Sequence, residues 1–297
     1  MMNAIGARRA SIHPFTVRQA SDNDRQQLLN LINHEIYVHR HLDWRAPLDW
    51  IGRSPYLVAE YKHTIQAALV CPPDPPEIAW IRLYAVSSAI DVGEAWKDLW
   101  STALIELSGQ SGSVVAAIPI QRWFSQLLER SRFTHTHNII LLLWDYNTGI
   151  PPETGKPTLI RSMIPDDLPK VQELDASSFS PLWRASLASL ELAFRQGTVA
   201  TVAEDGHILL GYQISTASPM GGHLARLAVR PDLQGQGIGY ALVRDLLSQF
   251  QRRGAMRVTV NTQEENIASL TLYHKAGFRQ TGETYPVFQY SCGTNLE

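Results

Sequence analysis

Three glycines stand close together in the segment Gln234-Gly235-Gln236-Gly237-Ile238-Gly239. Because glycine has no Cβ atom, such a turn lets a ligand approach the backbone closely. An apolar strand is expected before the turn, over residues 224–229, and an amphipathic helix after it, with apolar residues at three- and four-residue intervals up to Phe250. Backbone N–H groups at the start of a helix attract anions. The segment therefore predicts a turn that can hold a pyrophosphate.

The spacing of the glycines excludes two common phosphate-binding motifs. A dinucleotide fingerprint requires glycine or alanine three residues after Gly237, where Tyr240 stands instead. A P-loop requires Gly-Lys-Ser or Gly-Lys-Thr, which the segment lacks. The pattern that fits is Gln/Arg-x-x-Gly-x-Gly/Ala, with Gln234, Gly237 and Gly239 at the fixed positions. A glycine-rich loop that only turns the chain is the alternative interpretation of these residues.

A second group of polar residues follows this turn. Residues 257–261 alternate in the manner of a strand, and residues 266–278 predict a short helix that Asn266 caps and Gly277 ends. Ser269 and Tyr273 lie within this helix. Considered alone, Asn266 would be a plain helix cap and Tyr273 a core aromatic residue. The two motifs together, in this order and at this separation, are far more specific than either one.

Together these motifs resemble the acetyl-CoA-binding motifs of the GNAT superfamily of N-acetyltransferases, in which Asn-x-x-Ala/Ser-x-x-Leu-Tyr follows the glycine turn. The resemblance implies an α/β (α+β) fold, with a mixed, mostly antiparallel central sheet flanked by helices. It also implies acetyl-CoA as the co-substrate. The residues that it implies for binding acetyl-CoA are Leu227, Ala228, Val229, Gln234, Gly235, Gln236, Gly237, Ile238, Gly239, Tyr240, Asn266, Ser269 and Tyr273.

The chemistry that the resemblance implies is direct transfer of an acetyl group to a primary amine of a small molecule or a peptide N-terminus. Tyr273 occupies the family's general-acid position. His223 stands where many relatives carry a glutamate as general base, and an imidazole is chemically suitable for that role. A chain of water molecules is the alternative base. No metal is indicated.

A helical segment is expected over residues 179–196, after the first strand and helix of the C-terminal half. By resemblance this segment forms one side of the acceptor site. Phe179, Trp183 and Arg184 are therefore candidate substrate-binding residues. The alternative is that the two aromatic side chains belong to the core. Residues 199–204 and 207–215 predict a hairpin that turns at Asp205-Gly206.

The two halves of the chain share their opening pattern. Arg18 and Asp24 recur 143 residues later as Arg161 and Asp167, each arginine in a short strand and each aspartate at the start of a helix. A repeat of about one domain in length indicates tandem duplication. At the same offset, however, Asp91, Glu94 and Trp96 stand opposite Gln234, Gly237 and Gly239. A carboxylate and an indole there would repel and obstruct a pyrophosphate.

We therefore expect a degenerate GNAT-like domain without cofactor over residues 1–148, a linker rich in Pro, Gly and Thr over residues 149–157, and an active domain over residues 158–297. This layout resembles mycothiol synthase-like tandem proteins, and the C-terminal motifs are similar to those of ribosomal-protein and peptide N-terminal acetyltransferases. A non-catalytic module that binds acyl-CoA or a partner is the alternative function. The intact Asn266 and Tyr273 favour catalysis.

The composition and net charge indicate the cellular compartment and limit the classes of binding partner. The 297 residues carry a net charge of −2, which gives no general attraction to nucleic acid or to an anionic membrane. The two cysteines, Cys71 and Cys292, have no paired spacing, and no apolar run is long enough to cross a bilayer. We therefore expect a cytoplasmic protein, monomeric or homodimeric. The sequence does not identify the acceptor amine, because fold alone does not select among acceptors.

Overall fold

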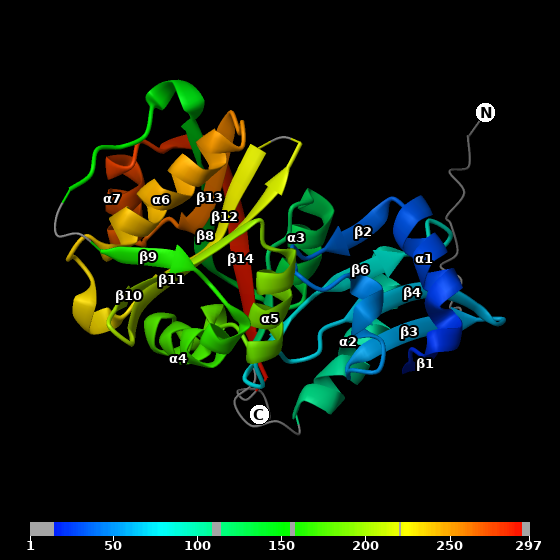
Figure 1. The fold of residues 1–297 in the computed structure, drawn as a ribbon. Coiled ribbons are helices and arrows are strands. Elements are labelled where there is room, and N and C mark those ends of the chain that lie inside the picture. Colours follow the sequence, from blue (N-terminus) through cyan, green and yellow to red (C-terminus); the bar gives the residue numbers. More distant parts are fainter. Residues whose placement is uncertain (1–14, 109–113, 155–157, 220, 293–297) are drawn as a thin grey trace, which may run out of the picture. The chain divides into compact units, whose positions relative to one another are not determined.

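The structure is a computed structural model that describes residues 15–108, 114–154, 158–219 and 221–292, and it contains two compact units (Figure 1). Unit 1 consists of the described residues within 1–40, 47–72 and 81–109. Unit 2 consists of those within 41–46, 73–80 and 110–297. Each unit is built around one sheet.

Unit 1 has a sheet whose strand order, within the described residues, is β1-β3-β4-β6-β2. All of its neighbouring strands are antiparallel. Apolar residues of α1 pack with those of β3, β4 and β6 to form its core. Its elements are β1 (Thr16–Gln19), α1 (Arg25–His34), β2 (Tyr37–Arg40), β3 (Tyr56–Tyr61), β4 (Thr64–Val70), β6 (Leu83–Val86) and α2 (Val92–Ser108).

Unit 2 has a longer sheet whose order, over the described strands, is β5-β7-β14-β8-β13-β12-β11-β10-β9. Its pairs are antiparallel except β12 with β13 and β5 with β7. Its strands are β5 (Ile78–Trp80), β7 (Val114–Ala117), β8 (Thr134–Asp145), β9 (Leu159–Ser162), β10 (Val199–Asp205), β11 (Ile208–Ser218), β12 (Gly221–Val229), β13 (Arg257–Gln263) and β14 (Arg279–Ser291). Its helices are α3 (Arg122–Arg130), α4 (Leu168–Ser178), α5 (Leu187–Gln196), α6 (Ile238–Arg252) and α7 (Ile267–Lys275).

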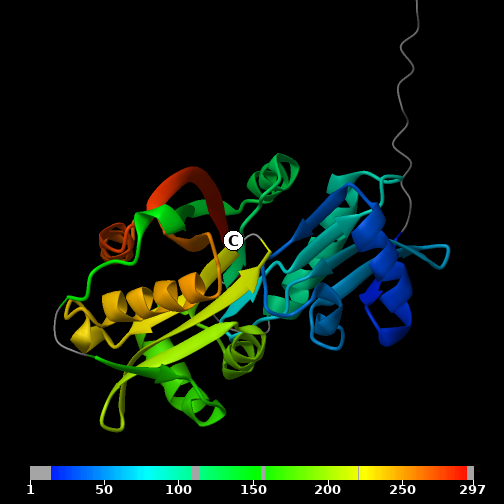
Figure 2. The same ribbon diagram turned by 45° about the horizontal axis from the view of Figure 1, so that its top comes forward.

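Helices cover the two faces of this second sheet (Figure 2). Leu224, Val258 and Val260 are buried against α6 and α7 on one face. Tyr212 and Ala228 are buried against α4 and α5 on the other. The alternation of side chains assigns the residues of β13, and those of β12 on either side of the bulge at Ala225, to one face or the other.

The internal repeat is visible in matching ion-pair networks. Arg18 binds Asp24 through two hydrogen bonds of 2.8 Å and also contacts Glu60. Arg161 binds Asp167 at 2.7 and 2.9 Å and contacts Glu204 in the same way. In each case the aspartate also accepts a hydrogen bond from the backbone three residues before it. The predicted correspondence between the openings of the two halves is therefore confirmed.

The predicted domain limits differ from the two units. β8 and β7, which we assigned to the first domain, lie in the sheet of unit 2, where β8 runs between β13 and β14. β8 pairs with β13 from Arg257–Asp145 to Gln263–Ile139, and its Leu142 and Trp144 are fully buried. The expected linker at 149–157 therefore does not separate the two units, because β7 and β8 precede it in the chain but belong to unit 2. Residues 155–157 of that linker lie outside the described residues.

Most other expected elements are present, with one correction. The glycine turn leads into α6, the second motif forms β13 and α7, and the predicted hairpin is β10–β11. The helix expected over 179–196 is wrong in its first half. Only Leu187–Gln196 is α-helical, and Pro181–Trp183 form one short 3-10 turn. Pro181 cannot lie inside a helix, and Ser186 begins the new one by accepting a hydrogen bond from the Ser189 amide.

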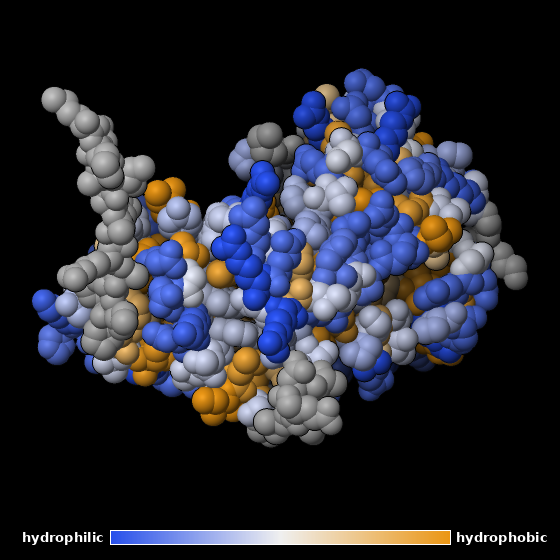
Figure 3. Space-filling model, turned by 180° about the vertical axis from the view of Figure 1, so that it is seen from behind, coloured by the Kyte–Doolittle hydropathy of each residue, from blue (hydrophilic) through white to orange (hydrophobic). Residues whose placement is uncertain are grey.

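On the face drawn in Figure 3, hydrophobic residues form separate patches among hydrophilic ones. None of the helices in the described part of the chain is long and apolar enough to cross a membrane. The same residues contain no group of three or more His, Cys, Asp or Glu side chains arranged to hold a metal ion.

Candidate active site

The glycine turn leaves open space beside the backbone. Gly235 and Gly237 have φ angles of +78° and +92°, and a Cβ atom added to either would meet no heavy atom within 4 Å. Gly237 is the N-cap residue of α6 and brings no side chain to cap the helix. The first N–H groups of a helix have no partner within the helix. The turn therefore has both the room and the donors that an anionic pyrophosphate needs.

The other predicted residues of this turn have different surroundings. Gln234 and Gln236 are exposed, and Gln234 Nε2 donates a hydrogen bond of 3.2 Å to the Val229 carbonyl oxygen. Ile238 and Tyr240 are buried, and the Tyr240 hydroxyl donates to the Pro152 carbonyl oxygen at 2.9 Å. Tyr240 can therefore contribute its backbone amide to a ligand, whereas its side chain holds the preceding segment against α6.

The strands β12 and β13 separate beside this turn. Their parallel pairing runs from Gly222–Val258 to Leu224–Val260, while β12 continues to Val229 and β13 to Gln263. A bulge at Ala225 marks the point of separation, because Leu224 pairs with Ser215 and Arg226 with Ile214. The predicted residues Leu227, Ala228 and Val229 lie beyond this point. β13 does not pair with their strand edge, so this edge can receive an extended ligand chain, although Gln234 Nε2 and the Ser178 hydroxyl already donate to the Val229 carbonyl oxygen.

Tyr273 lies in the same core cluster as Leu224, with Leu227 packed against that cluster. Its side chain is 5% exposed, and its ring packs on Phe278 with centroids 5.7 Å apart. Burial raises the pKa of the Tyr273 hydroxyl well above its ordinary value. The phenol is therefore protonated at neutral pH and can act as a hydrogen-bond and proton donor.

Asn266 and Ser269 act on the helix itself. Asn266 Oδ1 accepts a hydrogen bond of 3.1 Å from the Ser269 amide, and Asn266 Nδ2 donates to Gln263 Oε1 at 3.3 Å. Asn266 thus begins α7 and ties it to the end of β13. This contact fixes the helix that carries Tyr273.

His223 lies on the other face of β12. Gly222 and Leu224 on either side of it face α6, so the His223 ring points toward the face that carries α4 and α5. His223 Nδ1 is 2.9 Å from the hydroxyl oxygen of Thr259 on β13. Burial lowers the pKa of His223 below its ordinary value of 6.5. The ring is therefore neutral at pH 7 and can accept a proton.

A buried ion pair, which the sequence did not reveal, holds the segment after α4. Asp175 is fully buried and pairs with Arg226 of β12, and its Oδ1 also accepts a hydrogen bond of 2.9 Å from the Ala185 amide. Tyr212 donates to the same carboxylate. The sequence signal that could have revealed this pair is a charged residue at an apolar position in each element, Asp175 in the helix and Arg226 in the strand. Buried charges need such partners.

The three candidate substrate residues surround this ion pair. The Phe179 ring lies under the Arg226 guanidinium, 4.3 Å from its centre, and Arg226 Nη2 donates to the Trp183 carbonyl oxygen at 2.7 Å. Arg184 is exposed and donates through Nε to the Phe179 carbonyl oxygen at 3.1 Å. Phe179 and Trp183 are each partly exposed. The structure therefore brings Phe179 and Trp183 to the face that also carries His223.

The equivalent region of unit 1 is occupied by the chain itself. Asp91 Oδ1 accepts hydrogen bonds from the Gly93 and Glu94 amides at 2.8 and 3.0 Å, at the start of α2. The strand β2 pairs with β6 along its whole length, from Leu83 to Val86. These are the residues that correspond to Arg226–Val229. In unit 1 the Asp91 carboxylate thus lies where unit 2 has the open glycine turn, and β2 lies where unit 2 has the edge of Leu227–Val229 that β13 leaves unpaired.

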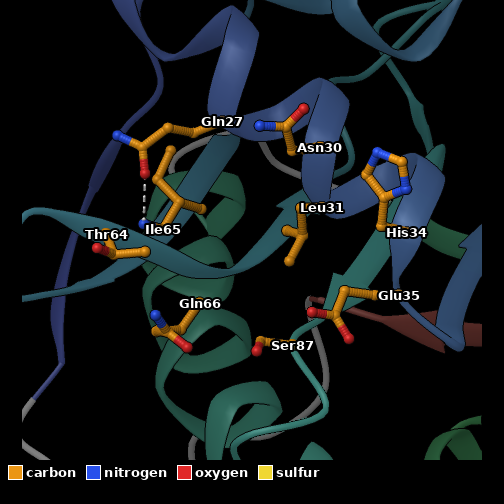
Figure 4. Close-up of a pocket in the computed structure, with 9 residues that line it drawn as sticks. All are labelled: Gln27, Asn30, Leu31, His34, Glu35, Thr64, Ile65, Gln66 and Ser87. Carbon is orange, nitrogen blue, oxygen red and sulfur yellow. Dashed lines mark hydrogen bonds between the residues drawn. The ribbon is translucent and has the colours of Figure 1, made fainter.

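A pocket of about 380 Å³ lies elsewhere in unit 1 (Figure 4). Its lining comes from α1, from β4 and from Ser87 after β6, and it includes none of the predicted site residues. Gln27 spans its edge by accepting a hydrogen bond of 2.9 Å from the Ile65 amide. We assign no chemistry to this pocket.

Comparisons with known proteins identify the family of the C-terminal half. A model of the Acetyltransferase (GNAT) family matches residues 168–278. N-alpha-acetyltransferase RimI of Mycobacterium tuberculosis is 31% identical over 133 residues, which are 43% of this chain and 82% of that relative. Mycothiol acetyltransferase of Geodermatophilus obscurus is 36% identical over 84 residues, which are 26% of this chain and 27% of that relative. The second match is therefore local.

The fold is also that of solved tandem proteins. A tandem GNAT protein from the clavulanic acid biosynthesis pathway has a TM-score of 0.62 at 14% identity, over 95% of this chain and 100% of that one. At that identity the likeness concerns the fold alone. The family model lies on the glycine turn, on the separating strands and on the helix of Tyr273. With 82% of a 31% identical relative also covered, the chain belongs to the GNAT family of acetyltransferases.

Proposed function

We propose that unit 2 transfers an acetyl group from acetyl-CoA to a primary amine, either of a small molecule or of a peptide N-terminus. The observation that carries this proposal is the separation of β12 and β13 beside an open glycine turn. Acetyl-CoA supplies an acetyl thioester when it is bound. The backbone of Gly235–Tyr240 would hold its pyrophosphate, and the free edge of Leu227–Val229 its extended arm.

Two groups on opposite faces of β12 serve the transfer. The amine nitrogen forms a bond to the acetyl carbon while the carbon–sulfur bond breaks. The proton lost by the amine passes to His223, and the Tyr273 hydroxyl gives its proton to the departing sulfur. Backbone N–H groups of the free β12 edge stabilise the negative charge that develops on the acetyl oxygen.

Replacement of Tyr273 by Phe should lower kcat by about 10- to 100-fold, toward the low end of what a general acid contributes, because a thiolate is a good leaving group even without a proton. The KM for acetyl-CoA should change little, since the ring and its packing on Phe278 remain. Steady-state rates of CoA release measure both constants. Tyr146→Phe removes an exposed hydroxyl elsewhere in unit 2 and serves as the control. Equal kcat values for the two variants would exclude Tyr273 as the acid.

The pH dependence of kcat/KM tests His223. A base must be neutral, and burial lowers the pKa of His223, so the decline that protonation of this ring causes should lie below pH 6.5, separate from the ionisation of the acceptor amine at higher pH. His223→Ala should lower kcat/KM by about 100-fold and remove that decline. His207→Ala, in the exposed β10–β11 turn, should leave the profile unchanged. If His223→Ala keeps the wild-type profile, the base is another group or water.

The proposal as a whole is tested by the release of CoA from acetyl-CoA in the presence of amines of several classes, namely arylalkylamines, amino sugars, polyamines and alanine-initiated peptides. Amine-dependent release with an acetylated product identified by mass supports acetyl transfer. Tight acetyl-CoA binding without release for any amine would favour the non-catalytic module instead.

A further inference from the structure

Four aromatic side chains form a continuous row in unit 2. The rings of His41 and Trp80 are stacked with centroids 4.9 Å apart, and Trp80 meets Trp183 at 5.6 Å. Trp183 in turn has an edge contact with His137, with centroids 6.2 Å apart. We call these four residues the aromatic row. Three of them come from the first half of the chain, and only Trp183 belongs to the segment that follows α4.

Trp183 links the aromatic row to β12, the strand of the proposed chemistry. The Trp183 carbonyl oxygen accepts a hydrogen bond from Arg226, which follows the β12 bulge by one residue. Arg226 faces α4 through its ion pair with Asp175, which is the face to which His223 also points. Arg226 and Asp175 together hold the backbone just after Trp183, through the Trp183 carbonyl and the Ala185 amide. The Trp183 backbone is therefore held beside β12, and the indole packs in the cluster that contains Ile139 of β8.

The sheet is uncovered next to this row. Asn261 lies on β13, a central strand, yet its side chain is exposed, and Leu141 opposite it on β8 is partly exposed. Val258 and Val260 on the other face of β13 are buried under α6. The face that carries His223 thus has an open area between the separated strands and the aromatic row.

Two polar side chains beside the aromatic row are engaged in hydrogen bonds or ion pairs. His137 Nδ1 binds the Glu265 carboxylate, and Arg184 Nε donates to the Phe179 carbonyl oxygen. Apolar side chains, among them Ile139 and Leu182, also pack around Trp80 and Trp183. A sugar ring would need free donors and acceptors around its perimeter. The partly exposed Trp183 offers a ring face, which suits an aromatic ring and the ammonium group of an approaching amine.

We propose that the aromatic row is the acceptor subsite and that the acceptor is an amine tethered to an aromatic ring, an arylalkylamine. This inference rests on the proposed acetyl transfer and names its substrate class. It also gives the first half of the chain a direct part in the site, because Trp80 and His137 support the Trp183 ring against which the acceptor lies.

The test compares matched amines on the full-length protein. 2-Phenylethylamine and 2-cyclohexylethylamine have the same amine and the same chain, but only the first has an aromatic ring, and glucosamine represents amino sugars. We expect kcat/KM to be about tenfold higher for 2-phenylethylamine than for its saturated counterpart. Trp183→Leu should erase this preference by raising KM for 2-phenylethylamine, with KM for acetyl-CoA unchanged. Trp183→Phe should retain most of it, and Trp123→Leu on α3 should have no effect.

Three results would overturn the inference, namely equal constants for the two matched amines, a preference for glucosamine, or an unchanged KM in Trp183→Leu. Calorimetric titration of 2-phenylethylamine into the protein with CoA present separates the two proposals. Binding that Trp183→Leu removes, without acetylation of any amine, would support the subsite and contradict the acetyl transfer. Acetylation of other amines without binding of 2-phenylethylamine would support the transfer and contradict the subsite.

Discussion

A chain that begins at residue 158 should fail to fold, although it contains both motifs of the family. It would lack β8, the strand between β13 and β14, and would leave both without their shared partner. It would also lose Ile140, Leu142 and Trp144 from the core under α6. Loss of three large buried side chains costs about 2–5 kcal/mol each, which together is comparable to the whole stability of a typical domain. Circular dichroism and thermal unfolding of the purified 158–297 fragment show whether it has secondary structure and a cooperative unfolding transition.

A chain that begins at residue 110 is the matched control. It keeps β7, α3 and β8, and we expect a cooperative unfolding transition and binding of acetyl-CoA. Supply of residues 1–150 as a separate chain should also restore soluble 158–297 to some extent, because β8 would then be present. The account is contradicted if the 158–297 fragment unfolds cooperatively and binds acetyl-CoA with the affinity of the full chain.

Gly237→Glu should weaken acetyl-CoA binding by at least about 100-fold while the fold persists. The substitution copies Glu94, which stands at the corresponding position of the first half. With φ at +92°, a side chain there costs about 1–2 kcal/mol of stability. The larger effect is on the ligand, since the carboxylate occupies the open space of the turn and repels the pyrophosphate. Calorimetric titration with acetyl-CoA gives the affinity, and thermal unfolding gives the stability.

Gly254→Glu is the matched control, because it also replaces a glycine of positive φ with glutamate, but away from the glycine turn. Gly254 follows α6 at its other end with φ of +79°, and a Cβ atom there would also meet open space. We expect the same small loss of stability and no change in affinity. Equal loss of affinity in both variants would mean that the effect comes from general strain, and wild-type affinity in Gly237→Glu would mean that the cofactor binds elsewhere.

The local parts of the site were predictable from sequence because their signals lie within about twenty residues. The apolar period of α6, the glycines before it and the Asn266 cap each specify a conformation without help from the rest of the chain. The matched Arg–Asp pairs near residues 18 and 161 likewise follow from short-range patterns. These are the parts of the sequence in which local preference and final fold agree.

The placement of β7 and β8 in the sheet of unit 2 was not predictable in the same way. The apolar run of β8 indicates a buried strand, but it does not indicate which sheet receives it, because strand pairing depends on residues far away in the chain. The Asp175–Arg226 pair and the aromatic row have the same origin. His41, Trp80, His137 and Trp183 come together only through the order of strands in the second sheet, so no spacing along the sequence announces them.

The central claim is that one site, in unit 2, binds acetyl-CoA. This assignment is supported by the difference between the corresponding regions of unit 1 and unit 2. β2 and the Asp91 carboxylate occupy the first, whereas the edge of Leu227–Val229 and the turn at Gly237 leave the second open. The most direct measurement is calorimetric titration of acetyl-CoA into the full-length protein. We predict one equivalent bound per chain. Two equivalents would contradict the assignment of an empty first unit, and no binding would contradict the acetyl-CoA site itself.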